Sequence, residues 1–112
     1  MDCIFCKIAA GSIPSKKVKE DEAVLAFHDL SPQAPTHILV IPKKHLASLA
    51  DAEVGDAALL GQLLLTAATV AREQGLGAGY RVVISTGKEG GQTVGHLHLH
   101  VLGGRQMHWP PG

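Results

Sequence analysis

Residues 94–102 of the chain read VGHLHLHVL, where histidines at positions 96, 98 and 100 alternate with apolar residues. Successive side chains of a β-strand point to opposite faces, so this alternation predicts a strand. The apolar residues between and after them, Leu97, Leu99 and Val101, would face a core, and the three imidazoles would lie together on the other face. The chain therefore needs a sheet that holds this strand with one side buried.

Three interpretations of the histidine row remain open at this point. The plainest is a half-exposed strand whose polar face happens to use histidine. A metal site is a second interpretation, but a strand rise of ~3.3 Å per residue puts His96 and His100 ~13 Å apart. Metal–nitrogen distances are ~2.1 Å, so all three could share an ion only if the strand bulged. The third is a catalytic row, in which one imidazole reacts and its neighbours orient it or hold the substrate.

The composition narrows the class of protein. A length of 112 residues suits one domain, 1–112, and the formal net charge is zero, with 10 basic and 10 acidic residues. This balance argues against a protein that binds a nucleic-acid backbone or an anionic membrane. The start lacks a secretory signal, and the apolar region 57–71 falls short of the ~20 residues that span a bilayer. We therefore expect a cytoplasmic protein with reduced cysteines.

Residue patterns predict an α+β domain. Residues 3–10 fit a short N-terminal helix, and residues 23–29, 36–42 and 80–86 fit strands. One long helix is expected from an N-cap at Asp51 to about Gln74, where Gly75 ends it. Short turns within each pair of strands favour an antiparallel sheet with the long helix packed on it.

Several residues near these elements could serve a nucleotide. Gly90, Gly91 and Thr93 precede the histidines and suit an oxyanion such as phosphate, although glycines alone are typical of a plain hairpin turn. Asp29 could accept hydrogen bonds from a ribose diol, or simply begin a turn. The remaining candidates are a base-pocket wall of Phe27 and Leu30, and His37 as an orienting group behind the active row.

The chain has two further unusual features. Cys3 and Cys6 form a Cys-x-x-Cys, which is either a pair of free structural thiols or half of a tetrahedral zinc site with His45 and His96. Trp109 lies between a histidine and two prolines near the C-terminus. It packs either on its own domain or, as we favour, on a partner subunit.

Three long segments resemble one family. GHLHLHVL fits the His-x-His-x-His pattern of the histidine-triad superfamily. AFHDLSPQAPTHILVIPKKH, GGQTVGHLHLHVLGGR and QMHWPPG resemble its branch of histidine triad nucleotide-binding proteins, the purine nucleoside phosphoramidases. The resemblance implies a two-fold homodimer whose sheets join and whose C-terminal segments reach the partner's active site, which would explain Trp109. It also implies cleavage of the P–N bond of adenosine or guanosine 5′-phosphoramidates.

The resemblance also implies residue roles. His98 would be the nucleophile that forms a covalent nucleotidyl-histidine, His100 would bind the phosphate, and His96 and His37 would orient the site. Thr93 would lie near the phosphate and the leaving amine, and Asp29 would hold the ribose. The other nucleotide-binding residues would be Phe5, Ile8, Phe27, Leu30, Ser85 and Gly91. The chemistry would need no cofactor, and a structural zinc would be held by Cys3, Cys6, His45 and His96.

Two departures from the family pattern qualify this. Ser85 stands where the family usually has asparagine, which predicts a weakened activity, and Gly95 stands where a larger residue is common. Three rival functions remain: a nucleotide-binding or scaffold protein with residual catalysis, a dinucleoside polyphosphate hydrolase or nucleotidyltransferase, and a plain metal-binding module. The intact His98 argues against the first, and GGRQMHWPPG favours the phosphoramidase branch over the second. The strand geometry argues against the third.

Overall fold

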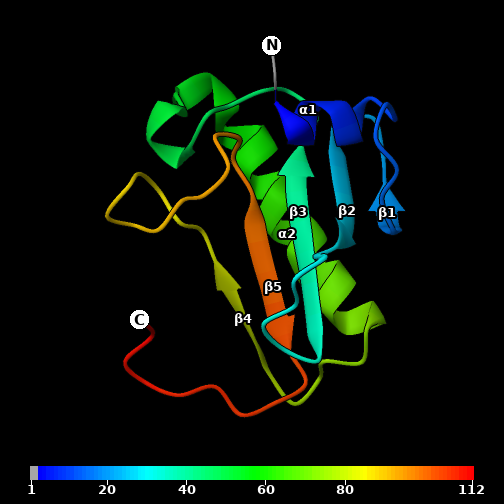
Figure 1. Ribbon diagram of the computed structural model, residues 1–112, viewed down its shortest axis with the longest axis vertical. Helices are drawn as coiled ribbons and strands as arrows, with labels where there is room; N and C mark the ends of the chain where they lie inside the picture. The colour runs from blue at the N-terminus through cyan, green and yellow to red at the C-terminus, as the bar shows by residue number, and fades with distance from the viewer. Residues whose placement is uncertain (1–2) are drawn as a thin grey trace.

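A five-stranded antiparallel sheet forms the centre of the protein, as a computed structural model that describes residues 3–112 shows (Figure 1). The strands follow the spatial order β1-β2-β3-β5-β4. With one long helix and a short N-terminal helix, this arrangement confirms the predicted α+β fold. The elements are α1 (Ile4–Ala9), β1 (Lys17–Glu20), β2 (Val24–His28), β3 (Thr36–Pro42), α2 (Ala57–Glu73), β4 (Tyr80–Val83) and β5 (Leu99–Gly103).

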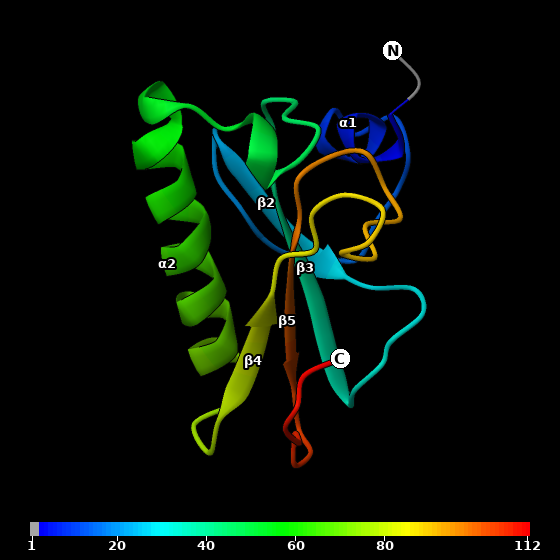
Figure 2. The ribbon, with the colours of Figure 1, turned by 90° about the vertical axis from the view of Figure 1, so that its left-hand side faces the viewer.

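The sheet has a hydrophobic layer on each face, and β3 supplies both. Helix α2 covers one face, whereas α1 and the loops lie on the other (Figure 2). Ile38 and Val40 pack beneath α2, while Leu39 and Ile41 face the cluster under α1. All four side chains are buried, which accounts for the continuous apolar run THILVIP in a central strand. The α1 layer is the one that borders the histidines.

Helix α2 begins later than the sequence predicted. Two 3₁₀ turns, η1 (Leu49–Asp51) and η2 (Val54–Asp56), precede it, and Asp56 rather than Asp51 is its N-cap. The backbone N–H of Glu53 donates to Asp56 Oδ2 at 3.0 Å, which completes a capping box at the start of η2, the turn that leads into α2. The predicted end is confirmed, because Gly75 adopts φ 76° directly after the helix.

The apolar region around α2 is longer than the sequence analysis allowed. Counted from η2, Val54–Glu73 has 20 residues with a mean hydropathy of 1.5, enough by length and composition to cross a membrane. This corrects our expectation of a region that is too short. One such helix is weak evidence for a membrane span, since the core helix of a globular protein passes the same test. Here Leu63, Ala67 and Val70 are buried against the sheet.

Strand β1 was not predicted, and β4 is shorter than the predicted strand 80–86. Strand β1 pairs with β2, yet in its sequence KVKE only Val18 is apolar and partly buried. A four-residue strand at the edge of a sheet needs no alternating apolar pattern, so periodicity could not detect it. The backbone hydrogen bonds of β2 stabilise it instead.

Candidate active site and metal centre

The histidine segment is only partly the strand that its alternation predicted. Strand β5 begins at Leu99, so His100 lies in the sheet while His96 and His98 precede it. A tight turn closes before the strand, where the His96 N–H donates to the Val94 carbonyl at 2.9 Å. The predicted strand is therefore too long, but the predicted division between the two faces is confirmed. Leu97, Leu99 and Val101 pack under α2. On the other face the rings of His96 and His98 contact Phe5 of the α1 layer, and the His98 ring contacts that of His100. The three imidazoles have separate partners, and the apolar residues between them are buried as expected.

His98 is buried and oriented by the backbone. Its Nδ1 lies 2.7 Å from the carbonyl oxygen of His96. A carbonyl can only accept, so Nδ1 carries the proton of the neutral ring and Nε2 has the free lone pair. The ring of Phe5 packs edge-on against that of His98, with centroids 5.1 Å apart. His98 thus has the tautomer that a nucleophile needs.

His100 is held in the opposite tautomer by a chain of hydrogen bonds. The backbone N–H of Gln33 donates to His37 Nδ1 at 3.0 Å. His37 Nε2 must then carry the proton, and it donates to His100 Nδ1 at 2.9 Å. The Asp29 carboxylate, 3.4 Å from His37 Nε2, favours the same proton position. His100 Nε2 therefore carries a proton that it can donate to a ligand.

Both members of this pair are neutral near pH 7. Burial lowers the pKa of the His100 imidazole to about 4, helped by the neighbouring His98 and His37 rings. Burial also lowers the pKa of His37, although the Asp29 carboxylate opposes the shift. The site consequently keeps hydrogen-bond directions that protonation of either ring would destroy.

These lowered pKa values predict a loss of stability in acid. Between about pH 6.5 and pH 4 the unfolded chain binds a proton on His100 that the folded protein excludes, so stability falls as the pH falls through this window. The lowered pKa of His37 changes stability in the same direction. We expect His100 alone to account for roughly 2 kcal/mol of the loss in the free energy of unfolding by pH 4. Urea unfolding at pH 7 and pH 4.5 should show a smaller loss for His100→Asn than for the wild type. Equal losses would contradict the assignment.

A cavity of about 290 Å³ opens beside His98 and His100. It brings together the predicted apolar wall and the polar groups at its rim, although Leu30 is 92% exposed and lies at the mouth. The predicted residues that line it are Phe5, Ile8, Phe27, Asp29, Leu30, Thr93, His98 and His100. Larger hollows of about 610 and 530 Å³ lie elsewhere and contain none of the triad histidines.

Some predicted residues lie outside this cavity, and others were missed. Gly91 lines the neighbouring 530 Å³ hollow, and Ser85 lines none of the three. His37 and His96 do not line the cavity: His37 contacts His100, and His96 contacts the two cysteines. Sequence reasoning missed the segment 13–16 and His28, which line the cavity. No motif marks that segment; only its position before β1 brings it to the site.

The four predicted metal ligands converge next to α1. Cys3 Sγ lies 3.3 Å and Cys6 Sγ 3.5 Å from His96 Nδ1, and His45 Nδ1 lies 3.2 Å from Cys6 Sγ. All four ligand atoms lie within 4.8 Å of one another. Such separations are close to the edges of a tetrahedron around zinc, whose ligands lie about 2.0–2.3 Å from the ion. The residues therefore fit a structural zinc.

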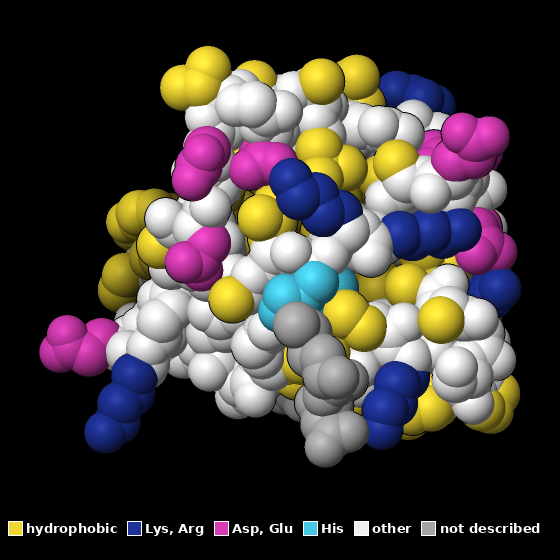
Figure 3. All heavy atoms as spheres, turned by 90° about the horizontal axis from the view of Figure 1, so that it is seen from above, with side chains coloured by type: hydrophobic (Ala, Val, Ile, Leu, Met, Phe, Trp, Pro, Cys, Tyr) yellow, Lys and Arg dark blue, Asp and Glu magenta, His cyan; other side chains and the backbone are white. Residues whose placement is uncertain are grey.

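The tautomer of His96 supports this centre. Its Nε2 donates to the carbonyl of Pro42 at 2.8 Å, so Nδ1 has a lone pair that faces the two sulfurs. The same end of the molecule shows histidine side chains reaching the surface (Figure 3). Burial raises the pKa of the Cys6 thiol, so a bound cation is what would favour its thiolate.

A second group of candidate ligands, Asp29, His37 and His100, does not suit a metal. Their ligand atoms also lie within 4.8 Å of one another. However, His37 Nδ1 already accepts the Gln33 N–H, so the Nε2 that faces the group carries a proton and cannot coordinate. This group is a hydrogen-bond relay instead.

Comparisons with known proteins agree with this geometry. A family model for the HIT domain matches residues 10–107. A HIT family hydrolase from Legionella pneumophila is 54% identical, with a TM-score of 0.97 over 99% of this chain and 100% of that one. A histidine triad protein from Clostridium difficile is 50% identical, with a TM-score of 0.92 over 96% and 94% of the two chains. A 14 kDa zinc-binding protein from Zea mays is 58% identical over 97% of this chain and 87% of its own length.

Proposed function

The chain belongs to the HIT domain family, and on that premise we propose that it is a hydrolase that cleaves the P–N bond of purine nucleoside 5′-phosphoramidates. The Legionella pneumophila relative, a HIT family hydrolase, supports hydrolytic chemistry in general. The observation that carries the proposal is the pairing of opposite tautomers at one cavity. His98 presents a free lone pair at Nε2, and His100 presents an N–H.

The reaction proceeds in two displacements. His98 Nε2 attacks the α-phosphorus, the P–N bond breaks, and the amine leaves with its electron pair and takes up a proton from the solvent. The resulting nucleotidyl-histidine has a positively charged ring, whose Nδ1–H the His96 carbonyl stabilises. Water then attacks phosphorus and releases a proton to the solvent, and the P–Nε2 bond breaks so that its electron pair returns to His98. The His100 N–H stabilises the charge on the phosphate oxygens in both steps.

The rest of the cavity suits a purine nucleoside. Phe5 and Phe27 meet edge-on with centroids 5.7 Å apart and form an apolar wall for the base. The Asp29 carboxylate at the rim accepts hydrogen bonds from the ribose diol, and Leu30 becomes covered when the ligand binds. Thr93 lies at the other rim, where the phosphate and the leaving amine would lie.

We propose that the Cys3, Cys6, His45 and His96 cluster holds zinc as a structural ion. Bound there, zinc cross-links α1 to the loop after β3 and to the histidine segment. The maize relative is named as a zinc-binding protein, and the ligand geometry of this cluster suits the same role in this chain. The proposed reaction needs no step at the ion.

We further propose that the single domain 1–112 works as a cytoplasmic two-fold homodimer. Strand β4 is an edge strand, and its Tyr80 is a large exposed apolar residue. Trp109 is 82% exposed on its own chain, and a second copy would cover it next to the partner's cavity. That nucleic acid and membranes are not partners remains a prediction from the charge balance.

The proposed function is tested by comparing substrates. The protein is mixed with adenosine or guanosine 5′-phosphoramidate, or with a dinucleoside polyphosphate, and nucleotide release is followed. We expect the phosphoramidates to be hydrolysed with the higher kcat/KM. Faster hydrolysis of the dinucleoside polyphosphate would favour that rival, and tight AMP binding without release of product would favour a binding protein.

Ser85 provides a prediction about activity. The residue follows β4 and does not line the cavity, and we propose that its short side chain makes no direct contact with a bound phosphate. A longer amide would add a hydrogen bond to a charged group, and we expect Ser85→Asn to raise kcat/KM roughly threefold to tenfold. The exposed Ser12→Asn is the matched control. A Ser85→Asn enzyme that is no faster than the wild type would contradict this account.

A further inference from the structure

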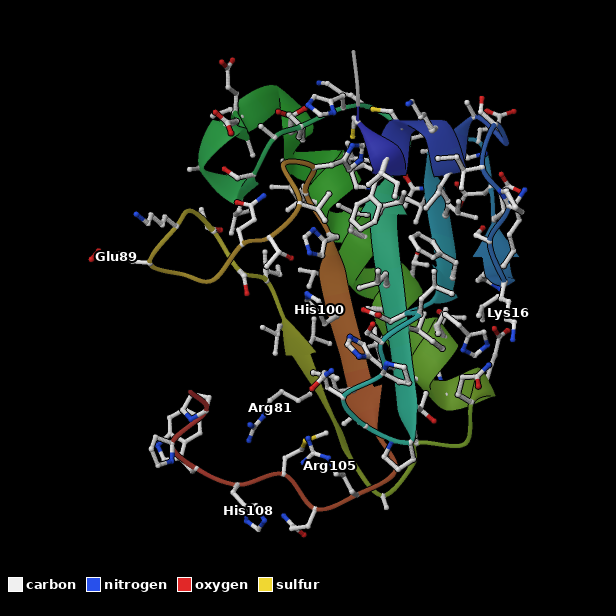
Figure 4. The ribbon with its side chains drawn as sticks, viewed as in Figure 1. Lys16, Arg81, Glu89, His100, Arg105 and His108 are labelled. Atoms are coloured by element: carbon white, nitrogen blue, oxygen red, sulfur yellow. The ribbon has the colours of Figure 1, made fainter. Side chains whose placement is uncertain are left out.

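The turn between β2 and β3 is joined to the segment that follows β5. Arg105 Nη2 donates to the Gln33 carbonyl at 3.1 Å. At the same contact a Cβ on Gly104 would lie only 2.8 Å from Pro35 Cβ, and Gly104 adopts φ 92°. Figure 4 places His100 in the middle of β5 and Arg105 beyond the end of that strand. Residues 104–105 therefore form a clamp on the turn.

The Arg105 side chain donates to backbone carbonyls rather than to a carboxylate among the described residues. Within residues 3–112 its guanidinium has no ion-pair partner, and it donates only to the carbonyls of Gln33 and Gln106. A charge-assisted hydrogen bond to a carbonyl is stronger than a neutral one and holds the acceptor in one orientation. The clamp thus acts on the Gln33 backbone.

The turn passes this constraint to the active site. The Gln33 N–H donates to His37 Nδ1, and His37 Nε2 donates to His100 Nδ1. If the Gln33 N–H moves away, His37 can carry its proton on Nδ1 instead. His37 Nε2 would then accept from His100 Nδ1, and His100 Nε2 would face the phosphate with a lone pair in place of an N–H.

We propose that Arg105 is a positioning residue that acts through Gln33 and His37 to hold His100 as the Nε2–H tautomer. Its effect on turnover rests on the proposed function, whereas its effect on the tautomer is a property of the protein alone. The two can therefore be tested separately.

The first test uses no substrate. Nitrogen-15 NMR of the histidine rings distinguishes a protonated ring nitrogen from one with a lone pair. In the wild type we expect His100 Nε2 to be protonated and Nδ1 bare. Arg105→Gln should shift both signals toward a mixture of tautomers, and Arg105→Lys should lie between the two. Arg72→Gln, on the exposed end of α2, should match the wild type. Wild-type His100 signals in Arg105→Gln would overturn the proposal.

The second test is kinetic. We expect Arg105→Gln to lower kcat about threefold to tenfold with KM changed less than twofold, because the ground-state contacts of the nucleoside remain. A loss carried by KM alone, or no loss of kcat despite a changed tautomer, would overturn the role in catalysis. If the wild type hydrolyses no phosphoramidate, the proposed function fails, and the NMR result still decides the relay.

Discussion

His98→Ala is expected to lower kcat/KM for an adenosine 5′-phosphoramidate by about a thousandfold or more. The variant removes the Nε2 lone pair that would attack phosphorus, and the neighbouring His100 cannot replace it, because its ring presents an N–H to the cavity. AMP affinity should change much less, since the base wall and Asp29 remain. Product release and AMP binding by calorimetry are the measurements.

A chemical rescue separates the lost nucleophile from a damaged fold. His98→Gly leaves space for added imidazole, which should restore part of the turnover in proportion to its concentration. His98→Ala that keeps activity within tenfold of the wild type would exclude covalent catalysis by this residue. Activity that imidazole does not restore, together with a lowered melting temperature, would instead indicate a structural role.

Zinc removal is expected to cause the largest change in stability. The cluster ties Cys3 and Cys6 of the α1 region to His45 and His96, so its metal-binding free energy adds to folding. We expect removal of the ion to cost about 3 kcal/mol or more, with one zinc per chain in protein purified without chelator. Urea unfolding with and without zinc measures the loss.

Two variants sharpen the zinc test. Cys6→Ala should unfold like the chelated wild type and gain nothing from added zinc, whereas Ser12→Ala should respond to zinc as the wild type does. Purified protein with well under one zinc per chain would undercut the structural site. So would a wild type whose stability is unaffected by chelation.

The main features of the fold were predictable because they depend on the apolar pattern. The run 36–42 is buried on both faces in the structure, and an uninterrupted apolar run indicates such a strand. The end of α2 was predictable because it is marked by a glycine, the residue type that adopts a φ such as the 76° of Gly75 without strain. The start of α2 was not, since Asp51 and Asp56 are equally good caps by sequence and only the 3₁₀ turns choose between them.

The site divides in the same way. The sequence could indicate which residue types converge, and Cys3, Cys6, His45 and His96 do converge. It could not indicate the tautomers, because backbone groups set them. The carbonyl of His96 orients His98, and the N–H of Gln33 orients His37. A backbone group has no residue-type signal, so the relay to His100 became visible only in three dimensions.

The central claim is that His98 forms a covalent intermediate, and one measurement tests it most directly. The wild type is mixed with excess adenosine 5′-phosphoramidate and quenched within one turnover in alkaline denaturant. The masses of the intact protein and of its peptides are then measured by mass spectrometry. The account predicts a mass increase of one nucleotidyl group on the peptide that contains His98. Turnover without an adduct, or an adduct on another residue, would contradict it.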